Sequence, residues 1–135
     1  MRLEHIGIAV DDIESTVRVF EALLQTQVYK TENVESEDVA THFLAVDGTK
    51  IELLEATSDE SVVARFVDRR GPGVHHLAFH VDDLAGAMER LRTSGFRILG
   101  DGIRPGADGK EVFFLHPRDT AGVLIEFCSP AGETP

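Results

Sequence analysis

The chain has 135 residues, of which 42% are hydrophobic and 27% are charged, as is typical of one compact globular domain. Its formal net charge of −11 argues against nucleic acid as a partner, because phosphate backbones need a basic surface. The single cysteine, Cys128, excludes an internal disulfide. No segment approaches the roughly 20 apolar residues of a membrane span, and no signal peptide is visible. We therefore expect a cytoplasmic protein with no membrane partner.

The first half of the chain predicts strands and one helix. Residues 3–10 alternate between apolar side chains and a second face of mostly small ones, which predicts a strand. Asp11 and Asp12 then predict the start of a helix that has one apolar stripe. Residues 39–46 and 49–55 predict two further strands joined by a tight turn.

A crossover follows at 57–73, with a short helix that we expect Ser58 or Asp59 to cap. The second half repeats the plan of the first, with a helix that we expect Asp82 and Asp83 to cap and Gly95 to end. Its expected strands lie at 74–81, 96–99, 111–116 and 122–128.

The two halves also repeat in sequence. LEHIGIAVDDI at 3–13 matches VHHLAFHVDDL at 74–84, and KIEL at 50–53 matches LIEF at 124–127. Such a repeat predicts an α+β fold of two tandem βαβββ modules, with a curved, cup-like mixed sheet and the helices outside. We place module one at about 1–56 and module two at about 74–129 of a single domain, 1–135.

Each half supplies one histidine early and one glutamate late: His5 and Glu52, then His76 and Glu126. Strand alternation points each of these side chains away from its apolar neighbours. If the strands form one cup, all four side chains converge inside it, where buried carboxylates need a counter-charge. Two imidazoles and two carboxylates suit a divalent ion of Zn, Mn, Co, Ni or Fe. The repeat therefore predicts a metal site.

Four segments carry a resemblance to a known family over about residues 3–129. They read LEHIGIAVDDI (3–13), KIELLEATSDES (50–61), GPGVHHLAFHVDD (71–83) and FFLHPRDTAGVLIEF (113–127). The chain resembles the vicinal oxygen chelate superfamily, which has the glyoxalase-like fold, and within it the methylmalonyl-CoA epimerases.

This resemblance implies a metal-dependent isomerase that interconverts (R)- and (S)-methylmalonyl-CoA through a metal-stabilised enolate. It implies a divalent ion (Co, Mn, Ni or Zn) held by His5, Glu52, His76 and Glu126, with Glu126 also acting as a catalytic base. An acyl-CoA substrate and a homodimer are implied as well. Coenzyme A phosphates would need local cations, for which we consider Arg69, Arg70, Arg104, Lys110 and Arg118.

The resemblance leaves the second catalytic base open. Some family members carry a glutamate where this chain has Thr41, which cannot serve as a base. Glu35, Glu37 and the expected ligand Glu52 are the alternatives.

Two other functions fit the same fold. Lactoylglutathione lyase uses a similar ligand set, but the segment His116–Gly122 differs from the turn usual in those enzymes. A non-catalytic small-molecule-binding protein of this fold would lack the four ligands.

Overall fold

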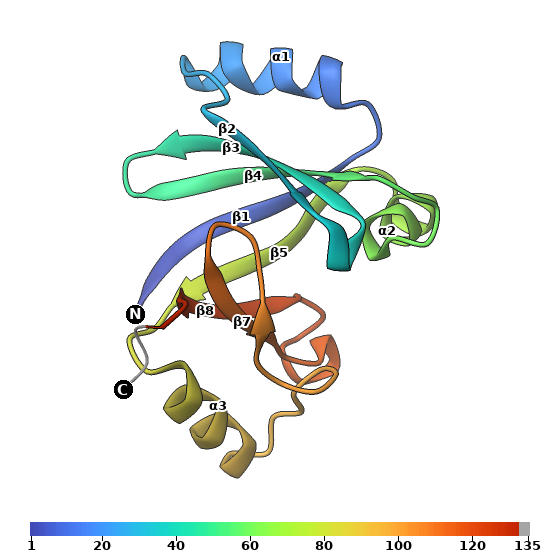
Figure 1. Ribbon diagram of the computed structural model, residues 1–135. Coiled ribbons are helices and arrows are strands. Elements are labelled where there is room, and N and C mark those ends of the chain that lie inside the picture. The colour runs from blue at the N-terminus through green and yellow to red at the C-terminus, as the bar shows by residue number, and fades with distance from the viewer. Residues whose placement is uncertain (133–135) are drawn as a thin grey trace. The chain divides into compact units, whose positions relative to one another are not determined.

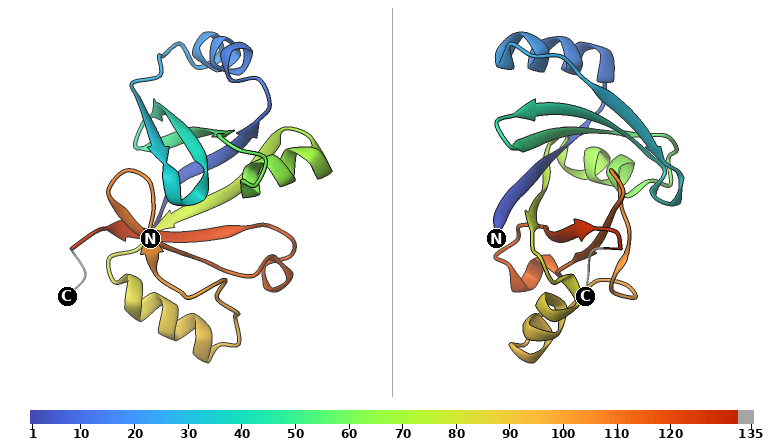
Figure 2. Two further views of the ribbon diagram at one scale, coloured as in Figure 1. Left: turned by 45° about the vertical axis from the view of Figure 1, so that its right-hand side comes forward. Right: turned by 60° about the vertical axis from the view of Figure 1, so that its left-hand side comes forward.

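The computed structural model describes residues 1–132, which contain three α-helices, two short 3-10 helices (η) and eight strands (Figures 1 and 2). The elements in chain order are β1 (Arg2–Val10), α1 (Ile13–Leu24), β2 (Lys30–Val34), η1 (Glu35–Glu37), β3 (Val39–Val46), β4 (Thr49–Ala56), α2 (Val62–Arg70), β5 (Gly73–His80), α3 (Leu84–Thr93), β6 (Arg104–Pro105), β7 (Lys110–Phe114), η2 (Pro117–Asp119) and β8 (Ile125–Pro130). Among the described residues, no helix combines the length and the apolar character needed to cross a membrane.

The chain forms two compact units. The N-terminal unit comprises His5–His75, and the C-terminal unit comprises the residues from His76 onward together with Met1–Glu4.

The N-terminal unit holds a four-stranded sheet in the order β2-β3-β4-β1. Strand β3 pairs with β2 and with β4 in antiparallel orientation, whereas β1 pairs with β4 in parallel. Helix α1 begins after Asp12, whose carboxylate accepts a hydrogen bond from the Ser15 backbone N–H. It packs along one face of this sheet (Figure 1), over the buried side chains Val10, Leu44 and Leu53.

The opposite face of the same sheet is covered only in part. Val63 of α2 packs there against Ala9, Val39 and Leu54. His5 and Glu52 belong to this second face, because they alternate with the residues that α1 covers.

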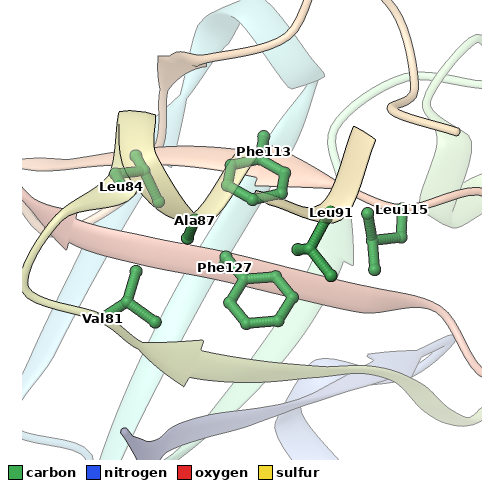
Figure 3. Close-up of a cluster of buried hydrophobic side chains, with 7 residues drawn as sticks. All are labelled: Val81, Leu84, Ala87, Leu91, Phe113, Leu115 and Phe127. Carbon is green, nitrogen blue, oxygen red and sulfur yellow. The ribbon is translucent and has the colours of Figure 1, made fainter. Parts of the chain in front are cut away.

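The C-terminal unit repeats the arrangement with the strand order β5-β8-β7-β6. Helix α3 starts after Asp83, whose carboxylate accepts from the Gly86 backbone N–H. The helix covers a core in which Phe113 and Phe127 stack with ring centroids 5.3 Å apart (Figure 3). The buried members of this core are Val81, Leu84, Ala87, Leu91, Phe113, Leu115 and Phe127.

The two predicted βαβββ modules are confirmed, as β1-α1-β2-β3-β4 and β5-α3-β6-β7-β8. The sequence patterns did not locate β2 or β6. Strand β2 reads KTENV and is the edge strand of its sheet, so it has no apolar alternation to reveal it. Strand β6 has only two residues.

Three local expectations were wrong. Helix α2 is capped by Ser61, not by Ser58 or Asp59. Residues 96–99 form no strand, only an isolated bridge between Ile98 and Leu115. The last strand begins at Ile125, because positive φ angles at Ala121 (58°) and Gly122 (87°) turn the chain just before it.

Candidate functional site

His5 and Glu52 form a buried pair in the N-terminal unit. Their strands, β1 and β4, run in parallel, and Glu52 lies opposite Gly7, two residues after His5. The His5 Nδ1 atom is 3.0 Å from Oε2 of Glu52. Only 5% of His5 and 3% of Glu52 are exposed, so this pair is held inside the protein.

His76 and Glu126 form the corresponding pair in the C-terminal unit. Strands β5 and β8 are again parallel, and Glu126 lies opposite Ala78, two residues after His76. The His76 Nε2 atom is 3.3 Å from Oε1 of Glu126, and each residue is 6% exposed. The repeat in sequence is therefore also a repeat in strand register, and each histidine meets the glutamate of its own unit.

A phenylalanine ring lies beside each His–Glu pair, and a cation lies over each ring. Sequence reasoning missed these cation–ring contacts. Phe43 on β3 lies opposite Glu52, and the Lys30 ammonium lies 4.8 Å from the centroid of the Phe43 ring. A phenylalanine beside a buried glutamate thus presents a face to a positive charge, an arrangement that stabilises the cation.

The C-terminal unit has the same combination of a phenylalanine ring and a cation. Phe114 on β7 lies opposite Glu126 and packs edge-on against the His76 ring, with centroids 5.8 Å apart. The Arg104 guanidinium lies 5.2 Å from the Phe114 centroid. The signal for both rings was present in the sequence, because Phe43 and Phe114 occupy matching positions of the repeat.

The chemistry of these side chains fits a divalent cation. Imidazole nitrogens and carboxylate oxygens bind Zn, Mn, Co and Ni. Each buried pair offers one donor of each kind, and a buried carboxylate is stabilised by a nearby positive charge.

The other carboxylates considered as a second base lie elsewhere. Glu35 and Glu37 belong to η1, the turn between β2 and β3. Thr41 is 2% exposed and lies on β3, opposite Leu54 of β4.

The segment before Glu126 is anchored by an ion pair. Asp119, the last residue of η2, accepts hydrogen bonds from the Arg97 guanidinium and from the Arg97 backbone N–H. These hydrogen bonds lower the pKa of Asp119 from 3.8 to about 2. The anchor fixes the chain a few residues before β8 begins.

The cations considered for coenzyme A differ in their surroundings. Arg104 lies over the ring of Phe114, the residue opposite Glu126. Arg70 instead lies over the ring of Phe66 in α2, 5.5 Å from its centroid. Arg69 and Arg118 are exposed side chains, and Lys110 is half-buried at the start of β7.

Comparisons with known proteins agree over almost the whole chain. A model of the Glyoxalase/Bleomycin resistance protein/Dioxygenase superfamily matches residues 4–114. The chain is 37% identical over 127 residues to the ethylmalonyl-CoA/methylmalonyl-CoA epimerase of Cereibacter sphaeroides, covering 93% of this chain and 95% of that protein. It is 35% identical over 126 residues to the mitochondrial methylmalonyl-CoA epimerase of Homo sapiens, covering 93% and 72%.

A solved structure gives the same result. A variant of Streptomyces coelicolor methylmalonyl-CoA epimerase, in complex with 2-nitronate-propionyl-CoA, matches with a TM-score of 0.90 and 37% sequence identity. The match covers 100% of this chain and 99% of that one.

Proposed function

Because the chain belongs to the Glyoxalase/Bleomycin resistance protein/Dioxygenase superfamily and, within it, to the methylmalonyl-CoA epimerase family, we propose that it interconverts (R)- and (S)-methylmalonyl-CoA. The chain is an isomerase with the glyoxalase-like fold. One observation carries the proposal: a chain similar over nearly its full length to named epimerases holds a buried His–Glu pair in each of its two units.

We propose that His5, Glu52, His76 and Glu126 together hold one divalent metal ion. Three facts support this set: the donor types, the burial of all four residues, and the identical register of the two pairs. A bound divalent cation would supply positive charge to stabilise the negative charge that develops on the thioester oxygen. Cobalt, manganese, nickel and zinc all suit these donors.

Side chains of the protein are expected to carry the proton to and from the α-carbon of the substrate. The α-carbon of the substrate must lose a proton on one side and gain one on the other. We propose that Glu126 is one of the two proton carriers, because its carboxylate is buried and oriented by His76. The residues directly opposite the two glutamates, Gly7 and Ala78, are small.

The substrate class is an acyl-CoA. Since the chain carries a net charge of −11, binding of the phosphates depends on local cations, and we propose Arg104 as one because of its place beside the C-terminal pair. The homodimer and the cytoplasmic location stay predictions.

Deuterium exchange tests the function. The protein is incubated with methylmalonyl-CoA in D₂O, and deuterium at the α-carbon is measured before chelation, after chelation and after a divalent metal is restored. We expect exchange that is lost with the chelator and regained with the metal. No exchange in the metal-loaded protein, together with turnover of the hemithioacetal of methylglyoxal and glutathione, would identify a lactoylglutathione lyase. No activity in either assay would identify a binding protein.

A further inference from the structure

A hydroxyl, an imidazole and a carboxylate form a hydrogen-bonded row across three strands of the N-terminal unit. Thr31 on β2 is the strand partner of His42 on β3, and its Oγ1 atom lies 3.1 Å from His42 Nδ1. The Nε2 atom of the same ring lies 3.1 Å from Oε1 of Glu55 on β4. Leu53, the partner of His42 on β4, belongs to the face that α1 covers, whereas the neighbouring Glu52 points to the other face. The row is therefore separate from the proposed metal site.

The chemistry of the three groups fixes the direction of both hydrogen bonds. An ionised carboxylate only accepts, so the proton of the neutral His42 ring lies on Nε2 and is donated to Glu55. The Nδ1 atom then carries the lone pair and accepts from the Thr31 hydroxyl. A hydroxyl that donates to an imidazole, which a carboxylate in turn orients, is the arrangement that activates a side chain as a nucleophile.

A cavity of about 420 Å³ adjoins this row, a size that accommodates a small ligand. It is lined by Asn33, Val34, Glu35, Asp38, Val39 and Thr57. Asn33 lies two residues after Thr31, on the same face of β2 and about 7 Å along the strand. A side-chain amide in this place can donate a hydrogen bond to the oxygen that becomes negative when a carbonyl group is attacked.

We propose that Thr31, His42 and Glu55 form a second active site, which transfers the acyl group of a carboxylic ester first to Thr31 and then to water. The carboxylates of Glu35 and Asp38 line the adjoining cavity. On a chain of net charge −11, they favour an ester whose alcohol is cationic over an anionic acyl-CoA. This activity does not rest on the proposed epimerase function.

The atoms balance over two steps. Thr31 Oγ1 bonds to the carbonyl carbon of the ester while its proton passes to His42 Nδ1, and the Asn33 amide stabilises the oxyanion. The bond from carbon to the alcohol oxygen then breaks, its electron pair stays on that oxygen, and the alcohol takes the proton from His42. Water attacks the acyl-Thr31 ester in the same way, and Thr31 regains its proton as the carboxylic acid leaves. Glu55 stays ionised throughout and stabilises the imidazolium.

Hydrolysis of p-nitrophenyl acetate and acetylthiocholine tests the site, with acetyl-CoA as the anionic comparison. Wild type quenched in acid during turnover should carry an acetyl group that peptide mass spectrometry locates on Thr31. Thr31→Val should abolish this species, Thr31→Ser should restore it, and His42→Gln should lower the acylation rate by about 10²- to 10⁴-fold. Ser36→Ala removes an exposed hydroxyl from the turn after β2 and, as the matched control, should behave as wild type.

Acetylthiocholine should be hydrolysed faster than acetyl-CoA, and the reverse order would overturn the proposed substrate class. Epimerisation of methylmalonyl-CoA and the unfolding temperature are measured on the same samples, and both should stay at their wild-type values. Ester hydrolysis at the wild-type rate in Thr31→Val, or acetyl groups on other residues alone, would overturn the inference and leave the proposed function intact. Equal loss in Thr31→Val and Thr31→Ser, or a wild-type protein that hydrolyses none of the esters, would overturn it as well.

Discussion

The carboxylate of Asp119 accepts three hydrogen bonds from Arg97. They come from the backbone N–H at 2.9 Å, from Nε at 3.0 Å and from Nη2 at 2.9 Å. This contact joins the turn before β8 to a residue that lies before β6 in the chain. A two-pronged surface ion pair therefore ties the turn that leads into the Glu126 strand to the segment before β6.

Replacing Asp119 with asparagine should lower stability in a pH-dependent way. The pKa of Asp119 is about 2 in the folded protein, against an ordinary value of 3.8 that applies to the unfolded chain. Between these two pH values the unfolded chain therefore binds more protons than the folded protein does. The stabilisation is complete above pH 3.8 and is lost as the pH falls towards 2. Denaturant unfolding should show Asp119→Asn less stable than wild type at neutral pH, with a difference that shrinks across that window. Asp59→Asn, at an exposed site, serves as control, and a difference that stays constant with pH would contradict the prediction.

Removing a histidine from either unit should reduce the bound metal. His5→Ala and His76→Ala each delete one of the four proposed donors, so after dialysis both should retain well under one equivalent of metal per chain by elemental analysis. His42→Ala is the control, because His42 bonds to Thr31 and Glu55 on the opposite face of the sheet. Full metal content in either ligand variant would remove that histidine from the site.

Glu126→Gln should preserve the fold and abolish α-proton exchange from both epimers. The substitution removes the proposed charged donor and the proposed proton carrier at once, and loss of a proton carrier alone costs about 10²- to 10⁴-fold in rate. Circular dichroism checks the fold, and deuterium exchange checks the chemistry. A variant with exchange near the wild-type rate would show that Glu126 is not the base. Glu111→Gln on the neighbouring strand β7 should leave exchange unchanged.

Phe113→Ala should destabilise the C-terminal unit. Phe113 is fully buried and stacks on Phe127, the neighbour of Glu126. Removing a buried phenylalanine side chain costs about 3–5 kcal/mol of the free energy of unfolding. Phe113→Leu should cost less, because it fills more of the cavity. Denaturant unfolding measures both variants, and a loss for alanine no larger than for leucine would contradict the packing of Phe113 against Phe127.

The sequence predicted the parts of this molecule that local patterns encode. Strands such as β3 and β4 alternate between a covered face and a second face, so their ranges were predicted to within a residue. The repeat singled out His5, Glu52, His76 and Glu126 because it aligned the same residue types in both halves.

Features that depend on pairing between strands were not predicted. The contacts of Lys30 with the Phe43 ring and of Arg104 with the Phe114 ring depend on which residues of neighbouring strands lie opposite one another. No local pattern fixes that register for an edge strand such as β2, whose side chains are mostly polar.

The pairing of the two parallel strands sets the His–Glu geometry in each unit, whereas the number of residues between the histidine and the glutamate does not. The histidine stands two places before the residue that faces the glutamate in both units, although the connecting segments differ in length and composition. Lengthening or exchanging these connections should therefore leave each His–Glu pair in place, whereas inserting a single residue inside β1 or β5 would turn its histidine to the other side of the sheet. Selection, or an engineer, is thus free to reshape the loops around two unchanged His–Glu contacts.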